Sequence, residues 1–435
     1  MLKNKVLKNA SWIIGCKIAQ SAMSFVITVL TARYFGPSNY GLINYAAAIV
    51  AFVTPMVQLG LGNIQVQEIV NKPDKEGEII GTTLAMSLAS AILGVIGIVS
   101  FSLISSKGNS EVIIVCALYS IVLFFQSAEL LQYWFQAKYL SKYASISSLI
   151  AFGVITIYKI FLLITRKGIY FFAVSNSIDY VIITFALLAI YKKLGGQKLK
   201  VSFFRAKKLF AKSKYYILAN MMIAVFSQTD RIMLKWMIND AATGLYSAAI
   251  SCACIANFVY TAIIDSFRPM IFESYKVSTE KFEKSMSLLY SVIIYLSLAY
   301  CIVVTVGADL IIKIIYGSQY AGAVLPLRIA VWFSTFSFIG SVRNIWILAE
   351  GKQRWIWIIN LSGALGNVIV NFILIPIIGI SGAAVASLLT QIFSNIIVTH
   401  IIPDTRPNTY LMIKGLNAFN LIKQFAKHNQ KENIK

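Results

Sequence analysis

Long apolar segments separated by short polar ones run through nearly the whole chain. Each segment is about 20 residues or longer, which is enough to cross the hydrocarbon core of a bilayer as an α-helix. None alternates in the way of a barrel strand, so we expect helices. The pattern predicts an all-α integral membrane protein with twelve transmembrane helices. They cover residues 11–32, 41–60, 79–105, 111–133, 143–164, 169–190, 215–237, 243–265, 286–308, 322–345, 355–377 and 380–402.

The longest polar stretch, residues 191–214, leaves six apolar segments on each side. We therefore expect four parts. They are an N-terminal six-helix lobe (1–190), a basic cytoplasmic linker (191–214), a C-terminal six-helix lobe (215–402) and a basic cytoplasmic tail (403–435).

Short motifs recur between the two halves at nearly constant spacing. Gly41-Leu42 is repeated as Gly244-Leu245, 203 residues later, and Gly168-Ile169 as Gly379-Ile380, 211 residues later. Because each half has an even number of spans, both have the same orientation. The repeat predicts a pseudo-two-fold axis along the membrane normal, with a central cavity between the lobes.

Composition and charge exclude several classes of protein. With 58% hydrophobic and 13% charged residues, the chain is not a soluble globular protein. The net charge of +22 does not indicate nucleic acid as a partner, because no basic patch is interleaved with a soluble fold. With the N-terminus in the cytoplasm, cytoplasmic segments carry 28 Lys and Arg and the opposite loops 5, so both termini are predicted to be cytoplasmic.

Several kinds of chemistry have no sequence support. The five cysteines all lie in apolar segments, where thiols behave as small hydrophobes, so we expect neither disulfides nor a metal site. There is no phosphate-binding loop and no His-Glu-x-x-His motif. We expect no cofactor, no ATP-driven transport by this chain alone, and no enzymatic activity.

Ionisable side chains within the apolar segments are the candidate functional groups. Each costs about 2.5–3.5 kcal/mol at the centre of a membrane helix, so it must pair or line a wetted cavity. Asp179, Asp230 and Arg231 are deepest, whereas Lys17 and two others (Lys159 and Arg343) lie nearer helix ends and can extend to the interface. The basic groups could meet an anionic ligand.

Polar residues also recur at positions that share one helix face. Lys17, Ser24 and Thr28 have the same spacing as Asn220, Ser227 and Arg231, and as Asn360, Asn367 and Asn371. These stripes either line a cavity or form hydrogen bonds between helices.

More than one role is open for the carboxylates within the apolar segments. Asp179 and Asp230 are candidates for proton or cation coupling, but Asp230 could equally neutralise Arg231 or Lys159. Glu129 lies near the end of its segment and is expected at the membrane surface.

Several short motifs follow one another along the chain. They are Ala32-Arg33-Tyr34-Phe35-Gly36-Pro37, Leu59-Gly60-Leu61-Gly62, Tyr133-Trp134-Phe135-Gln136, Ser227-Gln228-Thr229-Asp230-Arg231, Tyr316-Gly317-Ser318-Gln319-Tyr320 and Gly379-Ile380-Ser381-Gly382. In their joint order they resemble bacterial polysaccharide repeat-unit flippases of the O-antigen and capsule type, which belong to the multidrug/oligosaccharidyl-lipid/polysaccharide exporter superfamily.

The resemblance implies two six-helix lobes around a cationic vestibule in the bacterial cytoplasmic (inner) membrane. It also implies alternating access that moves an undecaprenyl-pyrophosphate-linked oligosaccharide to the outer leaflet, coupled to an ion gradient or the membrane potential. Lys17, Lys159, Arg231 and Arg343 could supply positive charge for the pyrophosphate. Membrane lipids, and the polysaccharide polymerase and chain-length machinery, are the partners it implies.

Three other functions remain as alternatives. A cation-coupled multidrug antiporter would favour carboxylates over the basic groups present here. A peptidoglycan lipid-precursor flippase usually has additional C-terminal spans. A polymerase or glycosyltransferase would need a long external loop, and every predicted external loop is short.

Overall fold

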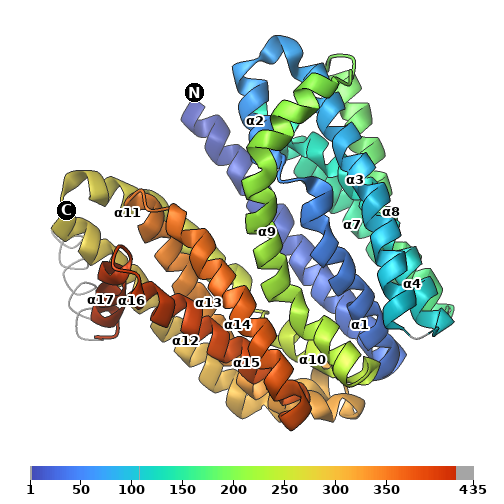
Figure 1. Cartoon of the computed structure of the whole chain (residues 1–435), viewed down its shortest axis with the longest axis vertical. Helices are drawn as coiled ribbons and strands as arrows, with labels where there is room; N and C mark the ends of the chain where they lie inside the picture. The colour runs from blue at the N-terminus through green and yellow to red at the C-terminus, as the bar shows by residue number, and fades with distance from the viewer. Residues whose placement is uncertain (1, 107, 418–435) are drawn as a thin grey trace. The chain divides into compact units, whose positions relative to one another are not determined.

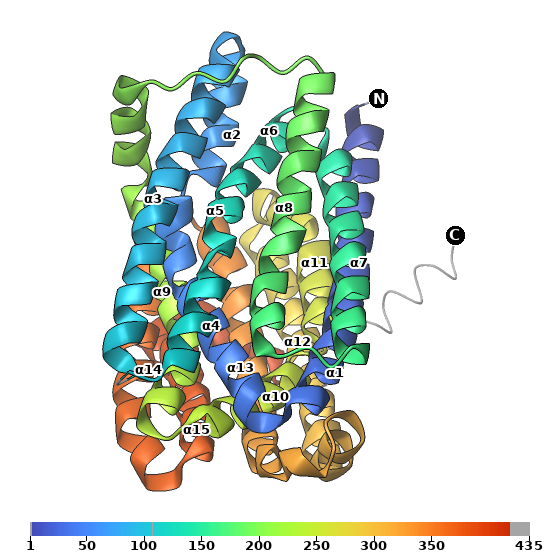
Figure 2. The same cartoon turned by 90° about the vertical axis from the view of Figure 1, so that its right-hand side faces the viewer.

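The computed structural model describes residues 2–106 and 108–417, and in α1 the side chains of residues 2–14 and of Lys17 lie outside the description. The described chain is helical almost throughout and contains no strand (Figures 1 and 2). It divides into two compact units, Met1–Gly244 (unit 1) and Leu245–Lys435 (unit 2). In this division α9 and the start of α10 belong with the first half of the chain, on which α9 packs. The predicted lobes, linker and tail stay a prediction.

The elements of unit 1 follow one another in this order: α1 (Leu2–Gln58), α2 (Gly62–Asn71), η1 (Pro73–Lys75), α3 (Glu76–Ser105), α4 (Ser110–Ser120), α5 (Val122–Gln126), η2 (Ser127–Leu131), α6 (Gln132–Ala137), α7 (Ser141–Ile164), α8 (Ile169–Lys193) and α9 (Phe203–Met237). Helix α10 (Asp240–Ala253) crosses the boundary between the units.

Unit 2 continues with α11 (Asn257–Val277), α12 (Thr279–Ile315), η3 (Ser318–Ala323), α13 (Val324–Ala349), α14 (Arg354–Ile378), α15 (Ile380–Ile392), η4 (Phe393–Val398), α16 (Thr399–Ile401) and α17 (Arg406–Gly415). The η4 segment is a single π-helical turn.

The prediction of an all-helical membrane protein is confirmed. In the described part of the chain, nine helices are long and apolar enough to cross a membrane, or ten if the bent pair α10–α11 counts as one span. The difference from twelve has two sources. Helix α1 contains both the first and the second predicted segment, and α9 falls outside the count because Asp230 and Arg231 interrupt its apolar sequence. The number twelve stays a prediction.

The bend within α1 explains how one helix covers two predicted segments. Gly36 has φ 69° and ψ 176°, which is outside the helical region and is easily adopted only by glycine. Pro37 follows directly and begins the next stretch of helix, where its missing N–H is not needed. The chain therefore changes direction at Gly36 without an intervening loop.

Each unit has its own apolar core. In unit 1, the second half of α1 packs on α3, α4 and α8 through residues such as Tyr45, Ile49 and Val57. In unit 2, α12 and α13 form the centre, and α17 docks on α12. The Ser291 hydroxyl donates to the Gly415 carbonyl at 2.7 Å, so the predicted tail begins with a packed helix.

Candidate functional site

Helix α9 carries the charged pair Asp230–Arg231 in its C-terminal half. Asp230 is only 5% exposed, and Arg231 is half-buried. The Arg231 guanidinium donates to the Gln228 side-chain oxygen at 3.0 Å, one turn earlier on the same helix. The Thr243 hydroxyl donates to the Arg231 carbonyl at 3.3 Å and so connects the start of α10 to this part of α9.

Two of the predicted polar stripes lie on the surface of unit 1. Asn220 and Ser227 on α9 and Ser24 on α1 are exposed, and Thr28 is half-buried. The third member of the α1 stripe, Lys17, has its side chain outside the described part of the helix. The exposed positions are available to a ligand, and their role in binding one stays a prediction.

A second polar group lies between α7 and α8. The Lys159 ammonium donates to the Asn176 side-chain oxygen at 2.8 Å, across the two helices. Asp179, three residues after Asn176, is close enough to Lys159 to interact with it electrostatically. The structure thus brings together two residues that were singled out separately, a basic one and an acidic one.

Glu129 joins this group, which the sequence did not indicate. Glu129 lies in η2 and interacts electrostatically with Asp179. The Gln58 amide, at the end of α1, donates to its carboxylate at 3.4 Å. We call Glu129, Lys159, Asn176 and Asp179 the unit 1 polar cluster. Three helical segments far apart in sequence contribute to it, so no local spacing could have revealed it.

Arg343 on α13 is 2% exposed, and its surroundings are neutral. The guanidinium donates to the Asn395 side-chain oxygen at 2.8 Å, to the Asn344 side-chain oxygen at 2.9 Å and to the Thr399 hydroxyl at 3.4 Å. Its Nε is buried and has no hydrogen-bond partner among the described residues. Asn395 lies in the π-helical turn η4, so Arg343 ties α13 to that turn. Whether Arg343 also meets a substrate stays a prediction.

Asn367 on α14 is fully buried between helices. Its amide donates to the Ser387 hydroxyl of α15 at 3.4 Å, and its side-chain oxygen accepts from Asn371 at 3.0 Å. In this structure the third stripe contributes to contacts between helices, which is the ordinary role of such side chains in helix bundles.

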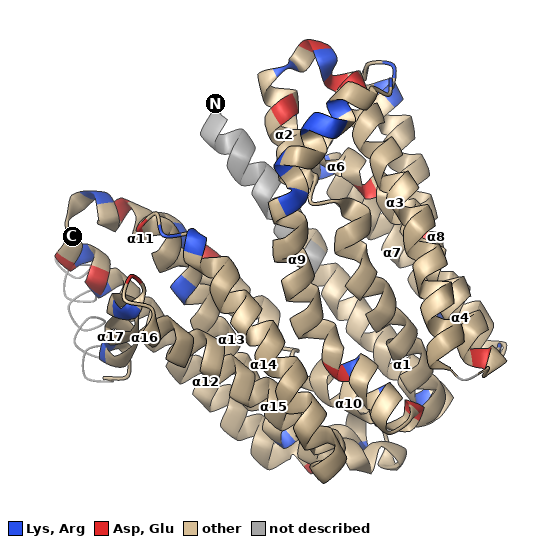
Figure 3. Cartoon of the chain, in the orientation of Figure 1, with Lys and Arg blue, Asp and Glu red and all other residues tan. Residues whose placement is uncertain are grey.

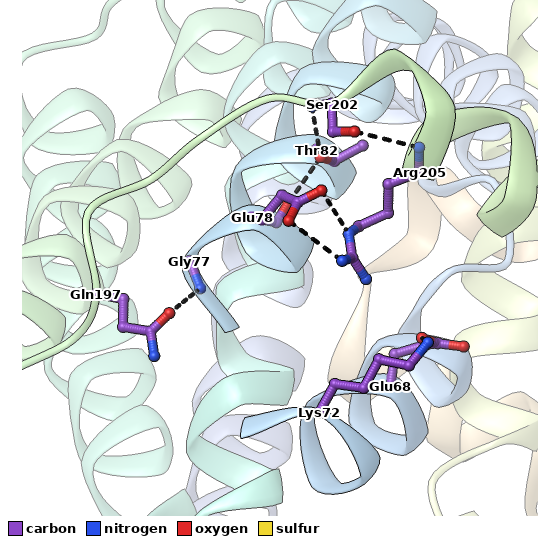
Figure 4. A network of polar contacts seen from close by, with 8 residues as sticks. All are labelled: Glu68, Lys72, Gly77, Glu78, Thr82, Gln197, Ser202 and Arg205. Carbon is purple, nitrogen blue, oxygen red and sulfur yellow. Dashed lines mark hydrogen bonds and ion pairs between the residues drawn. The ribbon is translucent and has the colours of Figure 1, made fainter. Parts of the chain in front are cut away.

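The basic linker has a defined conformation in unit 1. Residues 194–202, which we call the strap, run across the first turns of α3 (Figure 4). The Lys200 N–H donates to the Gly77 carbonyl at 3.1 Å, and the Ser202 N–H to the Thr82 hydroxyl at 3.1 Å. A Cβ at Gly81 would lie 2.4 Å from the Lys200 carbonyl oxygen, so the close approach requires glycine there.

Ion pairs fasten the start of α9 beside the strap. Arg205 binds Glu78 at 3.0 Å (Figure 4), and Lys212 binds Glu68, which also accepts from Lys72 at 3.2 Å. The sequence predicts a basic cytoplasmic linker here. The structure gives two of its basic residues, Arg205 and Lys212, carboxylate partners within unit 1.

No metal site is evident from these groups. In residues 2–106 and 108–417, no three His, Cys, Asp or Glu side chains gather closely enough to hold a metal ion. The unit 1 polar cluster can hold a proton or a small cation, because it contains two carboxylates and neutral oxygen acceptors. The half-buried positive charge of Arg231 on α9 can attract an anion.

Comparison with known proteins gives two relatives along most of the chain. A putative O-antigen transporter of Escherichia coli (strain K12) is 21% identical over 385 residues, which is 85% of this chain and 90% of that protein. The capsular polysaccharide biosynthesis protein CapF of Staphylococcus aureus is 22% identical over 400 residues, or 89% of this chain and 96% of that protein.

Solved structures with the same fold come from two groups of transporters. The lipid II flippase MurJ in an inward closed conformation superposes with a TM-score of 0.66 and 14% identity, covering 97% of this chain and 99% of MurJ. An inward-facing multidrug resistance transporter of the MATE family gives 0.68 and 11% identity, covering 90% and 95%. The fold is therefore that of the MATE and MurJ transporters.

The family itself follows from the sequence match. Residues 6–275, more than half of the chain, match the polysaccharide biosynthesis protein family. The resemblance drawn from the short motifs is thereby confirmed, and the chain belongs to the polysaccharide biosynthesis protein family.

Proposed function

We propose that the protein is a flippase that moves an undecaprenyl-pyrophosphate-linked oligosaccharide repeat unit from the cytoplasmic to the outer leaflet. The observation that carries this proposal is the charged and polar face of α9. Arg231 lies there, with Ser227 exposed one turn away and Asn220 exposed three turns away, in a chain that is otherwise strongly apolar. A pyrophosphate crossing the membrane needs such a positive group, because a charge is costly in hydrocarbon.

The topology we propose has twelve spans in two six-helix lobes, with both termini in the cytoplasm of a bacterial inner membrane. Within unit 1, the Lys and Arg residues gather at the end formed by α2, the strap and the start of α9 (Figure 3). Basic residues are enriched on the cytoplasmic side of membrane proteins. Reporter fusions at each terminus would test the orientation, and an extracytoplasmic signal from either one would overturn it.

We also propose that transport is coupled to an ion gradient through Asp179, within the unit 1 polar cluster, with Asp230 on α9 as the other candidate. The proximity of Asp179 to Glu129 and Lys159 supports Asp179, since a bound proton or cation would change the balance of charge in that group. Asp179→Asn and Asp230→Asn should separate the two candidates. The coupling residue is the one whose loss makes transport independent of the imposed gradient.

The function is tested in a strain that lacks the gene. Surface polysaccharide and the lipid-linked repeat units retained in the cytoplasmic leaflet are measured after complementation with the wild type, Lys17→Ala or Arg231→Ala. Arg268→Ala is the matched control, because Arg268 is exposed and pairs with Asp265 one turn away.

Three outcomes separate the possibilities. Rescue by the wild type and the control, with repeat units trapped in both charge variants, supports the function and the cationic site. Rescue by all variants keeps the function and refutes the site. Normal surface polymer in the deletion strain, together with new sensitivity to cationic dyes, would instead indicate a multidrug antiporter.

A further inference from the structure

The recurring glycine motifs meet each other in space inside unit 1. A Cβ added to Gly41, on α1 after the bend, would lie 1.7 Å from the Asp240 carbonyl oxygen and 2.8 Å from the Gly244 nitrogen. A Cβ added to Gly244, on α10, would lie 2.0 Å from the Pro37 carbonyl oxygen and 3.0 Å from the Gly41 nitrogen. The two glycines therefore bring two backbones into direct contact.

The contact is reciprocal in sequence as well as in space. Adding 203 to Pro37 and Gly41 gives Asp240 and Gly244, the same offset that relates the two Gly-Leu motifs. Each glycine faces the carbonyl oxygen of the residue four positions before its own counterpart. Contacts of this kind, in which i meets j and j meets i, are the mark of a two-fold axis. The contact between these two glycines is thus locally two-fold.

The contacts that the two glycines themselves make are individually weak. The carbonyl oxygens lie where a Cβ would be, so the glycine Cα–H groups can make Cα–H···O contacts, which are worth about 0.5–1 kcal/mol each. Glycine allows such close packing between membrane helices.

An ion pair and hydrogen bonds nearby lie within one repeat and would survive separation. Lys235 pairs with Asp240, and Thr243 donates to the Arg231 carbonyl at 3.3 Å, both within the second repeat. The Asn44 amide donates to the Tyr40 carbonyl at 2.8 Å within the first. One further contact joins the repeats, because the Lys235 ammonium also lies over the Tyr45 ring, 5.9 Å from its centroid.

The pair lies at the end of unit 1 opposite the strap. Figure 2 shows the strap at one end of α3 and α8, and the bend of α1 with the start of α10 at the other. In the proposed topology the strap end is cytoplasmic, so the glycine contact lies at the extracytoplasmic end.

We infer that Gly41 and Gly244 form the contact that closes the extracytoplasmic end of the transport path, and that it separates when this end opens. The inference rests on the proposed function, because a path that serves both leaflets must be shut at one end while it is open at the other. A two-fold contact of backbones suits this task. At the two glycines it closes tightly without side-chain interlocking.

The first test replaces each glycine by alanine. Ordinary contact begins at 3.4 Å, so the helices must part by more than 1 Å to admit a Cβ at either position. Gly41→Ala and Gly244→Ala should each lower surface polymer at least tenfold at equal membrane levels of protein. The double variant should be no worse than either single one, because both changes break the same contact.

The matched controls are Gly97→Ala on α3 and Gly153→Ala on α7. Both glycines are helical, and nothing lies within 4 Å of an added Cβ. They should retain wild-type export. Equal export by the control and contact variants would overturn the inference while leaving the proposed function intact. Failure of the wild type to restore polymer would overturn both.

The second test reads the contact itself and does not depend on how well a glycine variant folds. Ser38 and Ala241 are also related by 203 residues and directly follow Pro37 and Asp240. A Ser38→Cys/Ala241→Cys double variant should form a disulfide on mild oxidation, lose export, and recover it on reduction. Each single variant, which retains the native cysteines, is the control. Absence of the cross-link, or undiminished export by the cross-linked protein, would overturn the inference.

Discussion

Replacing Gly81 by alanine should loosen the strap without touching any charged group. The Cβ would lie 2.4 Å from the Lys200 carbonyl oxygen and 2.7 Å from the Lys200 nitrogen. Both atoms belong to the backbone, so no flexible side chain can move aside. The strap must shift by about 1 Å to reach the 3.4 Å of ordinary contact.

That shift affects the two hydrogen bonds that the strap's own N–H groups donate to α3. They are Lys200 N–H to the Gly77 carbonyl and Ser202 N–H to the Thr82 hydroxyl, each 3.1 Å. A typical intramolecular hydrogen bond contributes about 0.5–1.5 kcal/mol, so loss of both lowers the free energy of local opening by about 1–3 kcal/mol. Because 1.4 kcal/mol is tenfold in an equilibrium constant, the open strap becomes about five- to 150-fold more populated.

Limited trypsin digestion measures this population, because cleavage follows the open form when opening is fast. Lys198 and Lys200 are exposed and lie in the strap. Cleavage there should accelerate by the same factor in Gly81→Ala. Gly97→Ala, on the same helix with open space around it, should leave the rate unchanged. Equal rates in the two variants would refute the claim that backbone contact at Gly81 holds the strap.

Three further results are expected. Arg343→Lys should lower the thermal unfolding temperature in detergent, because a point-like ammonium cannot replace the hydrogen bonds of the guanidinium fork. Each lost charged hydrogen bond costs about 1.5–3 kcal/mol. An unchanged unfolding temperature would show that the fork contributes nothing to stability. The Arg354 guanidinium and the Trp355 indole N–H hold the pKa of Asp404 below its usual range. The ionised carboxylate therefore stabilises the folded protein at pH values above the ordinary carboxyl pKa. This stabilisation is lost as the pH falls through the lowered pKa of Asp404. An acid titration of tryptophan fluorescence should show that transition in the wild type but not in Asp404→Asn, and a transition in both would exclude Asp404 as its source. Asn109→Ala should lower the free energy of unfolding in chemical denaturation by about 1 kcal/mol, since the Asn109 side chain caps α4 by accepting from two backbone N–H groups. An unchanged free energy of unfolding would mean that the cap is redundant.

The sequence predicts the helices well because membrane spans have a strong local signal. Runs of about 20 apolar residues are set by bilayer thickness, and every predicted segment falls on helix in the described chain. The single helix α1 was not foreseeable as one element. Its two segments are joined through Gly36, whose backbone angles depend on how the next helix packs.

The candidate site was less predictable, because burial and partnership depend on distant segments. Arg343 was expected to reach a cavity, yet its surroundings in this structure are Asn395 and Thr399, more than 50 residues later. Glu129 looked interfacial from its position alone, and only the approach of α8 places it near Asp179. The Gly-Leu repeat was visible as a sequence motif, but its reciprocal contact needed coordinates.

In the strap, the path of the chain and the charge of the segment depend on different groups. Its path is set by main-chain groups, by the Gln197 side chain and by the glycines of α3, whereas Lys198 and Lys200 are exposed. The charge of this segment can therefore be changed without altering its path. A strap with glutamine in place of both lysines would keep its geometry while losing its attraction to anionic headgroups, so shape and electrostatics can be adjusted independently.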